Sequence, residues 1–216
     1  MKVFGIGLSK TGTLSLTKAL RILGYKTAHF PMGILALSGS GFSVDATRFD
    51  QYDALTDIPV AWAYKKLDRI YAGSKFILTT RDMDSWLRSN HTHYCSAAQW
   101  INRPQPYWWD NNKNGVWTKE TNLSIHLLLL EIYGIVGFDS KKFKRAYEQH
   151  LEEVLCYFKE RPNDLLVLDI CGGGGWEQLC PFLNEAVPVQ PFPRENITRK
   201  SAVSWQCSHH SSLKSD

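Results

Sequence analysis

Residues 3–23 constrain the fold of this chain more than any other stretch. The apolar run Val3-Phe4-Gly5-Ile6 predicts a buried strand, the small residues of 7–15 predict a turn, and apolar residues at helical spacing over 16–23 predict a helix. Such a unit directs the N–H groups of the turn and the N-terminus of the helix toward one point, and Lys10 lies in the turn. We therefore expect this turn to bind an anion, with phosphate or sulfate as the natural candidates.

The order of residues in this turn excludes two common nucleotide-binding loops. A Walker loop reads G-x-x-x-x-G-K-[ST], with the lysine after the last glycine, whereas Lys10 precedes Gly12 here. The dinucleotide-binding pattern G-x-G-x-x-G also fails, because position 10 is lysine.

The rest of the chain predicts an α/β fold. Strands are expected at 25–30, 52–56, 75–80 and 164–170, the last as a central strand, and helices at about 59–70, 122–136 and 140–160. Residues 31–50 are expected to form a loop with a short helix, and 100–121 a long aromatic loop. This alternation predicts three layers, in which helices flank a mostly parallel central sheet as in P-loop NTPases.

Length and composition bound the remaining possibilities. A chain of 216 residues suits one α/β domain, expected over 1–202, followed by a flexible polar tail over 203–216. A net charge of +4 is too small to indicate nucleic acid, and no apolar run is long enough for a membrane span. The five cysteines include no C-x-x-C pair, so we expect a cytoplasmic protein without a zinc site. Met1-Lys2 leads directly into the first predicted strand, so we expect no leader or anchor.

Three residues with suitable chemistry directly follow expected strands. Lys10, Asp57 and Arg81 take these positions, and the carboxyl ends of parallel strands meet at one edge of a sheet. The sequence therefore predicts that all three face one crevice.

Several segments resemble the sulfotransferases that use 3′-phosphoadenosine 5′-phosphosulfate (PAPS). The loop L-S-K-T-G-T-L-S at 8–15 is similar to the family's 5′-phosphosulfate loop, and I-L-T-T-R-D-M-D-S-W-L-R-S at 77–89 is similar to its 3′-phosphate motif. T-D-I-P at 56–59 stands where the cytosolic members have T-H-L-P with a catalytic histidine, and it resembles a smaller branch with T-D-x-P. The resemblance continues through 147–196 and covers about residues 2–198.

The resemblance implies sulfuryl transfer from PAPS to a hydroxyl or amine of a small-molecule acceptor, with PAP as the product. It requires no metal, and we expect no nucleic-acid or membrane partner; the oligomeric state stays open. Lys10 and the loop would stabilise charge on the departing phosphate, and Arg81 with Ser89 would bind the 3′-phosphate. The residues assigned to the cofactor are Ser9, Lys10, Thr11, Gly12, Thr13, Leu14, Ser15, Arg81, Ser89, Arg199 and Lys200. For the last two, a solvated basic tail is an equal alternative.

On the acceptor side, Asp57 is our candidate general base, with a simple helix N-cap as its rival interpretation. His29 either faces the acceptor or is a hydrogen-bonded residue at a strand end, and the sequence does not choose between Asp57 and a histidine as the base. Trp108 and Trp109 either line the acceptor pocket or only pack within their loop.

Two other functions, and a motif similar to that of methyltransferases, are alternatives to this interpretation. A P-loop kinase would need the lysine elsewhere, and a non-catalytic protein would bind PAP without transferring anything. The run L-V-L-D-I-C-G-G-G-G at 166–175 resembles the first motif of methyltransferases, but 41 residues after Gly175 are too few for the strands that must follow. Whether Gly172–Gly175 touch the nucleotide stays open.

Overall fold

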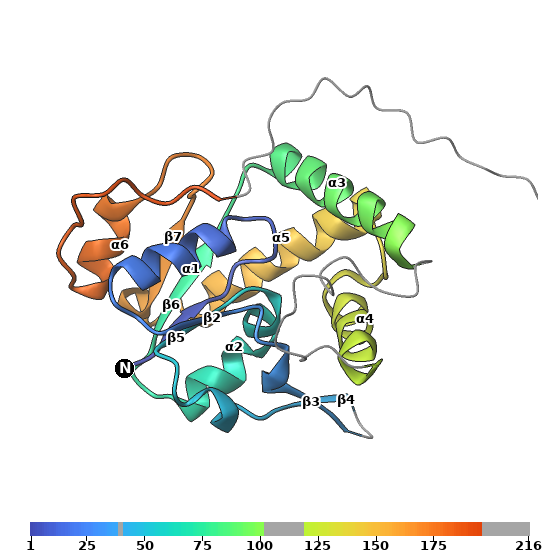
Figure 1. Ribbon diagram of the computed structural model, residues 1–216, viewed down its shortest axis with the longest axis horizontal. Coiled ribbons are helices and arrows are strands. Elements are labelled where there is room, and N and C mark those ends of the chain that lie inside the picture. The colour runs from blue at the N-terminus through green and yellow to red at the C-terminus, as the bar shows by residue number, and fades with distance from the viewer. Residues whose placement is uncertain (39–40, 102–118, 196–216) are drawn as a thin grey trace, which may run out of the picture.

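The structure is a computed structural model that describes residues 1–38, 41–101 and 119–195 (Figure 1). The strands are β1 (Val3–Gly5), β2 (Thr27–His29), β3 (Leu35–Ser38), β4 (Gly41–Val44), β5 (Ala54–Thr56), β6 (Lys75–Thr79) and β7 (Leu165–Leu168). The α-helices are α1 (Thr13–Ile22), α2 (Ile58–Ile70), α3 (Met83–Ile101), α4 (Lys119–Tyr133), α5 (Ser140–Tyr157) and α6 (Trp176–Leu183). Short 3-10 helices are η1 (Met32–Ile34), η2 (Thr47–Phe49) and η4 (Pro162–Asp164).

Five strands form a parallel sheet in the order β2-β5-β1-β6-β7. β1 is central, and the chain reaches strands on both sides of it, so the loop after β1 lies at the switch point where open α/β sheets bind ligands. The register sets Gly5, His29 and Thr56 side by side at the carboxyl ends of three neighbouring strands. The expected parallel sheet is confirmed.

Alternating residues of the strands bury both faces of the sheet, which produces three layers. Phe4, Leu55 and Phe76 point into one core with α2 and α5, whereas Val3 and Ile77 point into a second core with α1 and α6. Because each strand alternates between the two cores, helices must cover both faces. The expected three-layer α/β fold is therefore confirmed.

The last strand takes a different place from the one we expected. The run at 164–170 predicted a central strand, but β7 is the edge of the sheet, and Val167 is 45% exposed. A local apolar run predicts that a strand is buried. It does not predict which strands lie on either side of it. The prediction of a central position was therefore wrong.

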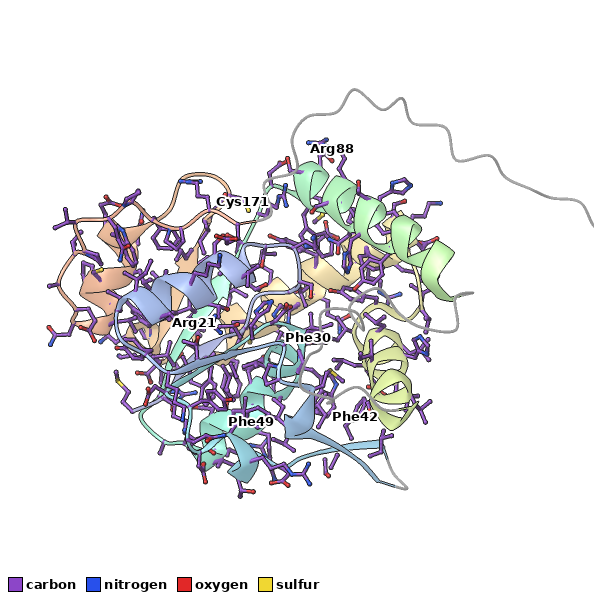
Figure 2. The ribbon with its side chains drawn as sticks, in the orientation of Figure 1. Arg21, Phe30, Phe42, Phe49, Arg88 and Cys171 are labelled. Carbon is purple, nitrogen blue, oxygen red and sulfur yellow. The ribbon has the colours of Figure 1, made fainter. Side chains whose placement is uncertain are left out.

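Residues 31–50 hold more regular structure than the predicted loop with a short helix. They contain η1, η2 and an antiparallel pair, β3 with β4, in which Leu35 faces Val44 and Leu37 faces Phe42. The available signal was the alternation of apolar residues on both sides of a Gly-Ser pair. Phe42 packs edge-on against Trp62 of α2, with ring centroids 5.5 Å apart, and Figure 2 shows it below α4.

Helices α3 and α4 stand beyond the carboxyl ends of the strands, on one side of the molecule (Figure 1). Asp82 accepts from the Ser85 N–H (2.9 Å) at the start of α3, as a helix N-cap does. Within the described ranges, no helix combines the length and apolarity needed to cross a membrane. The expected tail at 203–216 lies outside the described residues.

Candidate active site

The loop between β1 and α1 is held tightly against β6. The Thr11 hydroxyl donates to the Leu8 carbonyl (2.6 Å) and lies 2.6 Å from the Thr79 hydroxyl. A Cβ on Gly7 would lie only 1.9 Å from Thr79 Oγ1, so a residue without a side chain is required there. Packing and hydrogen bonds therefore fix the course of this loop.

The N-terminus of α1 presents free N–H groups at the end of this loop. The N-cap Gly12 has φ 98° and offers no side-chain cap, and the first turn carries no acidic residue. Leu16 is the first residue of the helix whose N–H bonds back, to the Gly12 carbonyl at 2.9 Å. The N–H groups of Thr13, Leu14 and Ser15 therefore lack the helical partner that later residues have. This arrangement suits an anion.

Lys10 lies in the same loop with φ 72°, a left-handed conformation that is costly for a residue other than glycine. Burial lowers the pKa of its amine; the Asp57 carboxylate opposes this shift, and the Arg81 guanidinium adds to it. Within the described part of the chain, the Lys10 amine forms no ion pair within 4.0 Å. A half-buried cation beside free helix N–H groups can stabilise a phosphate or sulfate oxygen.

Arg81 lies directly beside this loop, as the strand order predicts. Its Nη1 donates to the Lys10 carbonyl (3.0 Å), and its buried Nε has no hydrogen-bond partner among the described residues. The Tyr147 hydroxyl of α5 accepts from the Arg81 N–H (2.9 Å) and donates to the Arg81 carbonyl (2.8 Å). Tyr147 thereby fixes the backbone of Arg81 and leaves guanidinium donors for a ligand.

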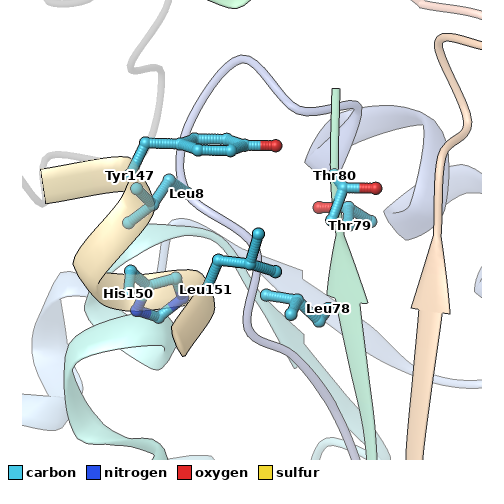
Figure 3. Close-up of a pocket in the computed structure, with 7 residues that line it drawn as sticks. All are labelled: Leu8, Leu78, Thr79, Thr80, Tyr147, His150 and Leu151. Atoms are coloured by element: carbon cyan, nitrogen blue, oxygen red, sulfur yellow. The ribbon is translucent and has the colours of Figure 1, made fainter. Parts of the chain in front are cut away.

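Helix α5 also packs against the carboxyl ends of β1 and β6. Figure 3 shows Tyr147, His150 and Leu151 pointing toward β6 around a small cavity that Leu8 and Leu78 also line. His150 Nε2 lies 2.7 Å from the Ile6 carbonyl and donates to it, and burial lowers the pKa of this histidine. His150 is therefore a buried histidine whose hydrogen bond supports the end of β1.

Ser89 and Trp86 come to the site from α3. Ser89 is 9% exposed. Trp86 Nε1 donates to the Ser9 carbonyl at 2.9 Å, which ties α3 to the loop. The role of Trp86 was missed, although it lies inside the 77–89 motif.

Asp57 is the most constrained acidic residue of the site. It is 6% exposed and has φ 86°, which for a non-glycine residue requires support from its surroundings. Its Oδ1 accepts from the Ile58 N–H (2.8 Å), as a helix N-cap does, and from the Ser9 hydroxyl (2.5 Å). The predicted N-cap is therefore confirmed, and the carboxylate also contacts the anion-binding loop.

His29 lies against the other oxygen of Asp57. Its Nε2 is 3.2 Å from Asp57 Oδ2, and its Nδ1 is 3.0 Å from the Thr56 hydroxyl and 3.2 Å from the Thr17 hydroxyl. The Thr17 and Thr56 hydroxyls lie 2.6 Å apart. A bare ring nitrogen would repel the carboxylate, so the proton of a neutral ring belongs on Nε2. The two threonines were missed.

His93 of α3 lies near the same charges. Desolvation lowers its pKa to about 4, and the Lys10 charge contributes in the same direction. His93 is therefore neutral near pH 7.

The C-terminal part of the described chain crosses the start of α1. Ser15 Oγ accepts from the Glu195 N–H (2.9 Å), and the Glu195 carboxylate pairs with Lys18 (2.7 Å). Arg194 donates to the Ile170 carbonyl (2.9 Å). The Ser15 hydroxyl, expected at the cofactor, thus also positions residues 194–195.

The glycine turn after β7 lies next to the loop. Asp169 holds it by accepting from the N–H groups of Gly172 (2.7 Å) and Gly174 (2.8 Å), and Ile170 would contact a Cβ on Gly12. Trp108, Trp109, Arg199 and Lys200 lie outside the described residues. In the described ranges, no cluster of three His, Cys, Asp or Glu side chains could hold a metal ion.

The structure brings Ser9, Lys10, His29, Asp57 and Arg81 together at the carboxyl ends of four neighbouring strands. A family model described as "Sulfotransferase domain" matches residues 2–38 and 44–201. The chain is also similar to "Ava biosynthesis cluster protein M" of Aspergillus versicolor, with 27% identity over 211 residues that cover 89% of this chain and 80% of the relative.

Proposed function

This chain belongs to the sulfotransferase family, and from that premise we propose that it transfers a sulfuryl group from PAPS to a hydroxyl or amine of a small molecule. One observation carries the proposal: the anion-binding loop that holds Lys10 contacts both the Arg81 guanidinium, through the Lys10 carbonyl, and the Asp57 carboxylate, through the Ser9 hydroxyl. Two sites for anions beside a carboxylate suit a doubly phosphorylated nucleotide and an acceptor that must lose a proton.

The described residues fit a ligand with two anionic ends. The buried Arg81 Nε without a partner supports this fit, because an unpaired buried donor costs free energy unless a ligand pairs with it. The free N–H groups at the start of α1 give the same support at the other end. When bound, PAPS supplies the sulfuryl group and leaves as PAP.

The roles follow from the chemistry of each side chain. Lys10, with the Thr11 to Ser15 segment and Ser9, would hold the 5′-phosphosulfate end and stabilise the charge on the departing phosphate. Arg81 would bind the 3′-phosphate through its remaining donors, which include the unpartnered Nε, and Ser89 would supply a hydroxyl.

Asp57 would accept the proton of the acceptor. Ser9 and the Ile58 N–H orient one carboxylate oxygen, and His29 orients the other. A base held by three neighbours keeps one orientation, which is a requirement for general-base catalysis. His29 acts through Asp57 and is in this proposal a positioning residue.

The name of the related protein and the free cysteines support the proposed acceptor and compartment. The related protein of A. versicolor is named for a biosynthesis cluster, which supports a small-molecule acceptor. The cysteines Cys156, Cys171 and Cys180 are unpaired, which supports a reducing compartment, and we place the reaction in the cytoplasm without a metal.

Ligand binding and transfer can be tested separately. Thermal unfolding is measured with PAP, PAPS, ATP plus magnesium, and S-adenosylmethionine, because a ligand at 100 times its Kd stabilises the protein by about 2.7 kcal/mol. We expect stabilisation by PAP and PAPS only. Transfer is then measured as label moving from ³⁵S-labelled PAPS to a panel of alcohols, phenols and amines.

Each rival function has its own result in this experiment. Stabilisation by ATP with magnesium instead of PAP would support a kinase. Stabilisation by PAP with no labelled product from any acceptor would support a non-catalytic nucleotide-binding protein.

A further inference from the structure

Two buried polar atoms between α3 and α4 have no hydrogen-bond partner among the described residues. They are Asn90 Oδ1 on α3 and Tyr133 Oη on α4, in side chains that are 0% and 2% exposed. An unpaired buried polar atom is costly, and native proteins satisfy nearly all of them. Both atoms therefore call for a partner that the described residues do not supply.

Ring contacts place Tyr133 opposite the turn of α3 that carries Asn90. The Tyr133 ring lies 6.5 Å from that of Trp86 and 6.4 Å from that of Tyr94, measured between centroids. These residues stand four positions before and after Asn90 on the same helix, so all three share a face. Tyr133 is held there by stacking on Phe143, with centroids 4.1 Å apart and planes at 4°.

This face of α3 adjoins the proposed active site. Trp86 donates to the Ser9 carbonyl, and the Ser9 hydroxyl donates to Asp57. Desolvation raises the pKa of both Tyr94 and Tyr133, and the Asp57 charge acts on both in the same direction. The two phenols therefore lie within electrostatic range of the proposed base.

The two atoms have complementary hydrogen-bonding capacities. The Asn90 amide nitrogen donates to the Trp86 carbonyl (2.9 Å), which leaves Oδ1 as a pure acceptor. Tyr133 Oη can donate. A single hydroxyl group can donate to Asn90 Oδ1 and accept from Tyr133 Oη, so one such group has the hydrogen-bonding capacity that the two atoms require. Neither atom carries a charge that would compensate a buried ion, so the group must be neutral.

We propose that Asn90 and Tyr133 bind a second, neutral hydroxyl of the acceptor, so that this enzyme prefers uncharged acceptors with two hydroxyl groups. The inference rests on the proposed function, because one hydroxyl is sulfated beside Asp57 while the other pairs with Asn90 and Tyr133. The aromatic rings of Trp86, Tyr94 and Tyr133 favour a flat acceptor at this point.

The test uses matched acceptors with one or two hydroxyl groups, namely phenol against resorcinol and 2-phenylethanol against tyrosol. Dissociation constants are measured by calorimetry with and without PAP, and kcat and KM with PAPS. We expect the wild type to bind the dihydroxy member of at least one pair roughly tenfold more tightly, since one or two hydrogen bonds are at stake. Tyr133→Phe should remove this preference and raise KM for the dihydroxy compound, with kcat for the monohydroxy compound unchanged.

Tyr64→Phe is the matched control, because Tyr64 Oη is also buried without a partner but lies on α2 against Tyr157 and Phe158. This variant should keep the full preference. Asn90→Leu should reduce the preference as Tyr133→Phe does. Because Tyr133 Oη has no hydrogen-bond partner among the described residues, Tyr133→Phe should unfold at the same temperature as the wild type.

Two results would overturn the inference: no preference for either dihydroxy compound in the wild type, or a preference that survives in Tyr133→Phe. A loss of stability in Tyr133→Phe without any change in acceptor binding would assign the two atoms to a bound water instead. Failure of the proposed function is distinguishable, because it appears as absent PAP binding in the wild type, while the acceptor preference is also measured without nucleotide.

Discussion

His29 Nε2 lies 3.2 Å from Asp57 Oδ2, although the two residues are 28 positions apart in the sequence. His29 ends β2, and Asp57 directly follows β5. The contact exists because His29 is the last residue of β2 and faces Thr56, the last residue of β5, in the parallel register. The residue after Thr56 is therefore brought to the imidazole. The T-H-L-P segment of the cytosolic sulfotransferases has a histidine where Asp57 stands in this chain, and here a histidine from the neighbouring strand contacts the aspartate.

Asp57→Asn separates a catalytic role from a capping role. Asparagine still accepts from the Ile58 N–H but cannot take a proton, so we expect turnover to fall roughly 10²–10⁴-fold with PAP binding and unfolding temperature nearly unchanged. Asp139→Asn, which caps α5 through the Lys142 N–H, is the matched control and should keep full activity. Unchanged turnover in Asp57→Asn would remove Asp57 from the mechanism.

A pair of substitutions at His29 tests whether the histidine positions Asp57. The amide of glutamine can reach Asp57 as Nε2 does, whereas the shorter asparagine reaches only the threonine hydroxyls, so His29→Gln should retain more turnover than His29→Asn. A lost hydrogen bond to a charged group predicts roughly a 10- to 100-fold lower kcat for His29→Asn. The PAP dissociation constant and the pH dependence of kcat are measured together; equal kcat in both variants would contradict the positioning role.

The lowered pKa of Lys10 predicts how nucleotide binding depends on pH. The ammonium form of Lys10 binds the anion, and burial lowers the pKa of this amine below its ordinary value near 10.5. PAP affinity should therefore fall as pH rises from 7 toward 10. Lys10→Arg keeps its charge over this range, so calorimetry should show a flatter profile for that variant. Identical profiles for the two proteins would show that another group controls binding.

Arg81→Lys tests the assignment of the 3′-phosphate. Lysine keeps the charge but not the forked donors, so we expect PAP to bind roughly tenfold more weakly, while AMP, which lacks the 3′-phosphate, binds as before. Ser89→Ala should change the same ratio in the same direction by a smaller factor. Arg88→Lys, at an exposed position of α3 (Figure 2), is the control and should leave both dissociation constants unchanged.

Gly7→Ala tests the close packing of the loop against β6. The added methyl group would overlap Thr79 Oγ1 and approach Thr11 Oγ1, and we expect the free energy of unfolding in urea to fall by roughly 3 kcal/mol. Gly73→Ala has a φ of 74° but nothing within 4 Å of its Cβ, so it should cost only about 1 kcal/mol. Equal losses would show that the contact at Gly7 costs no more than the left-handed backbone at Gly73, which would contradict the close packing of the loop.

Local patterns predicted most of the sheet and the helices that flank it. Apolar periodicity placed β1, β5, β6, α1 and α2 within a few residues, and the loop at 8–15 was recognisable because its chemistry lies in one continuous stretch. The hairpin of β3 and β4 and the edge position of β7 were not predicted, since pairing between strands depends on residues far apart in the chain.

The sequence by itself determined the anion-binding loop, the alternation of strands and helices, and the identity of Lys10, Asp57 and Arg81 as chemically capable residues. Each of these is a local property of a short segment. Only the tertiary structure decided that His29 contacts Asp57 and that Tyr147 holds the Arg81 backbone. It also decided that Asn90 Oδ1 and Tyr133 Oη find no partner in the described part of the chain. The physical reason is that a hydrogen bond forms only when the distance between its two groups is right to within a few tenths of an ångström. The packing of distant segments sets this distance.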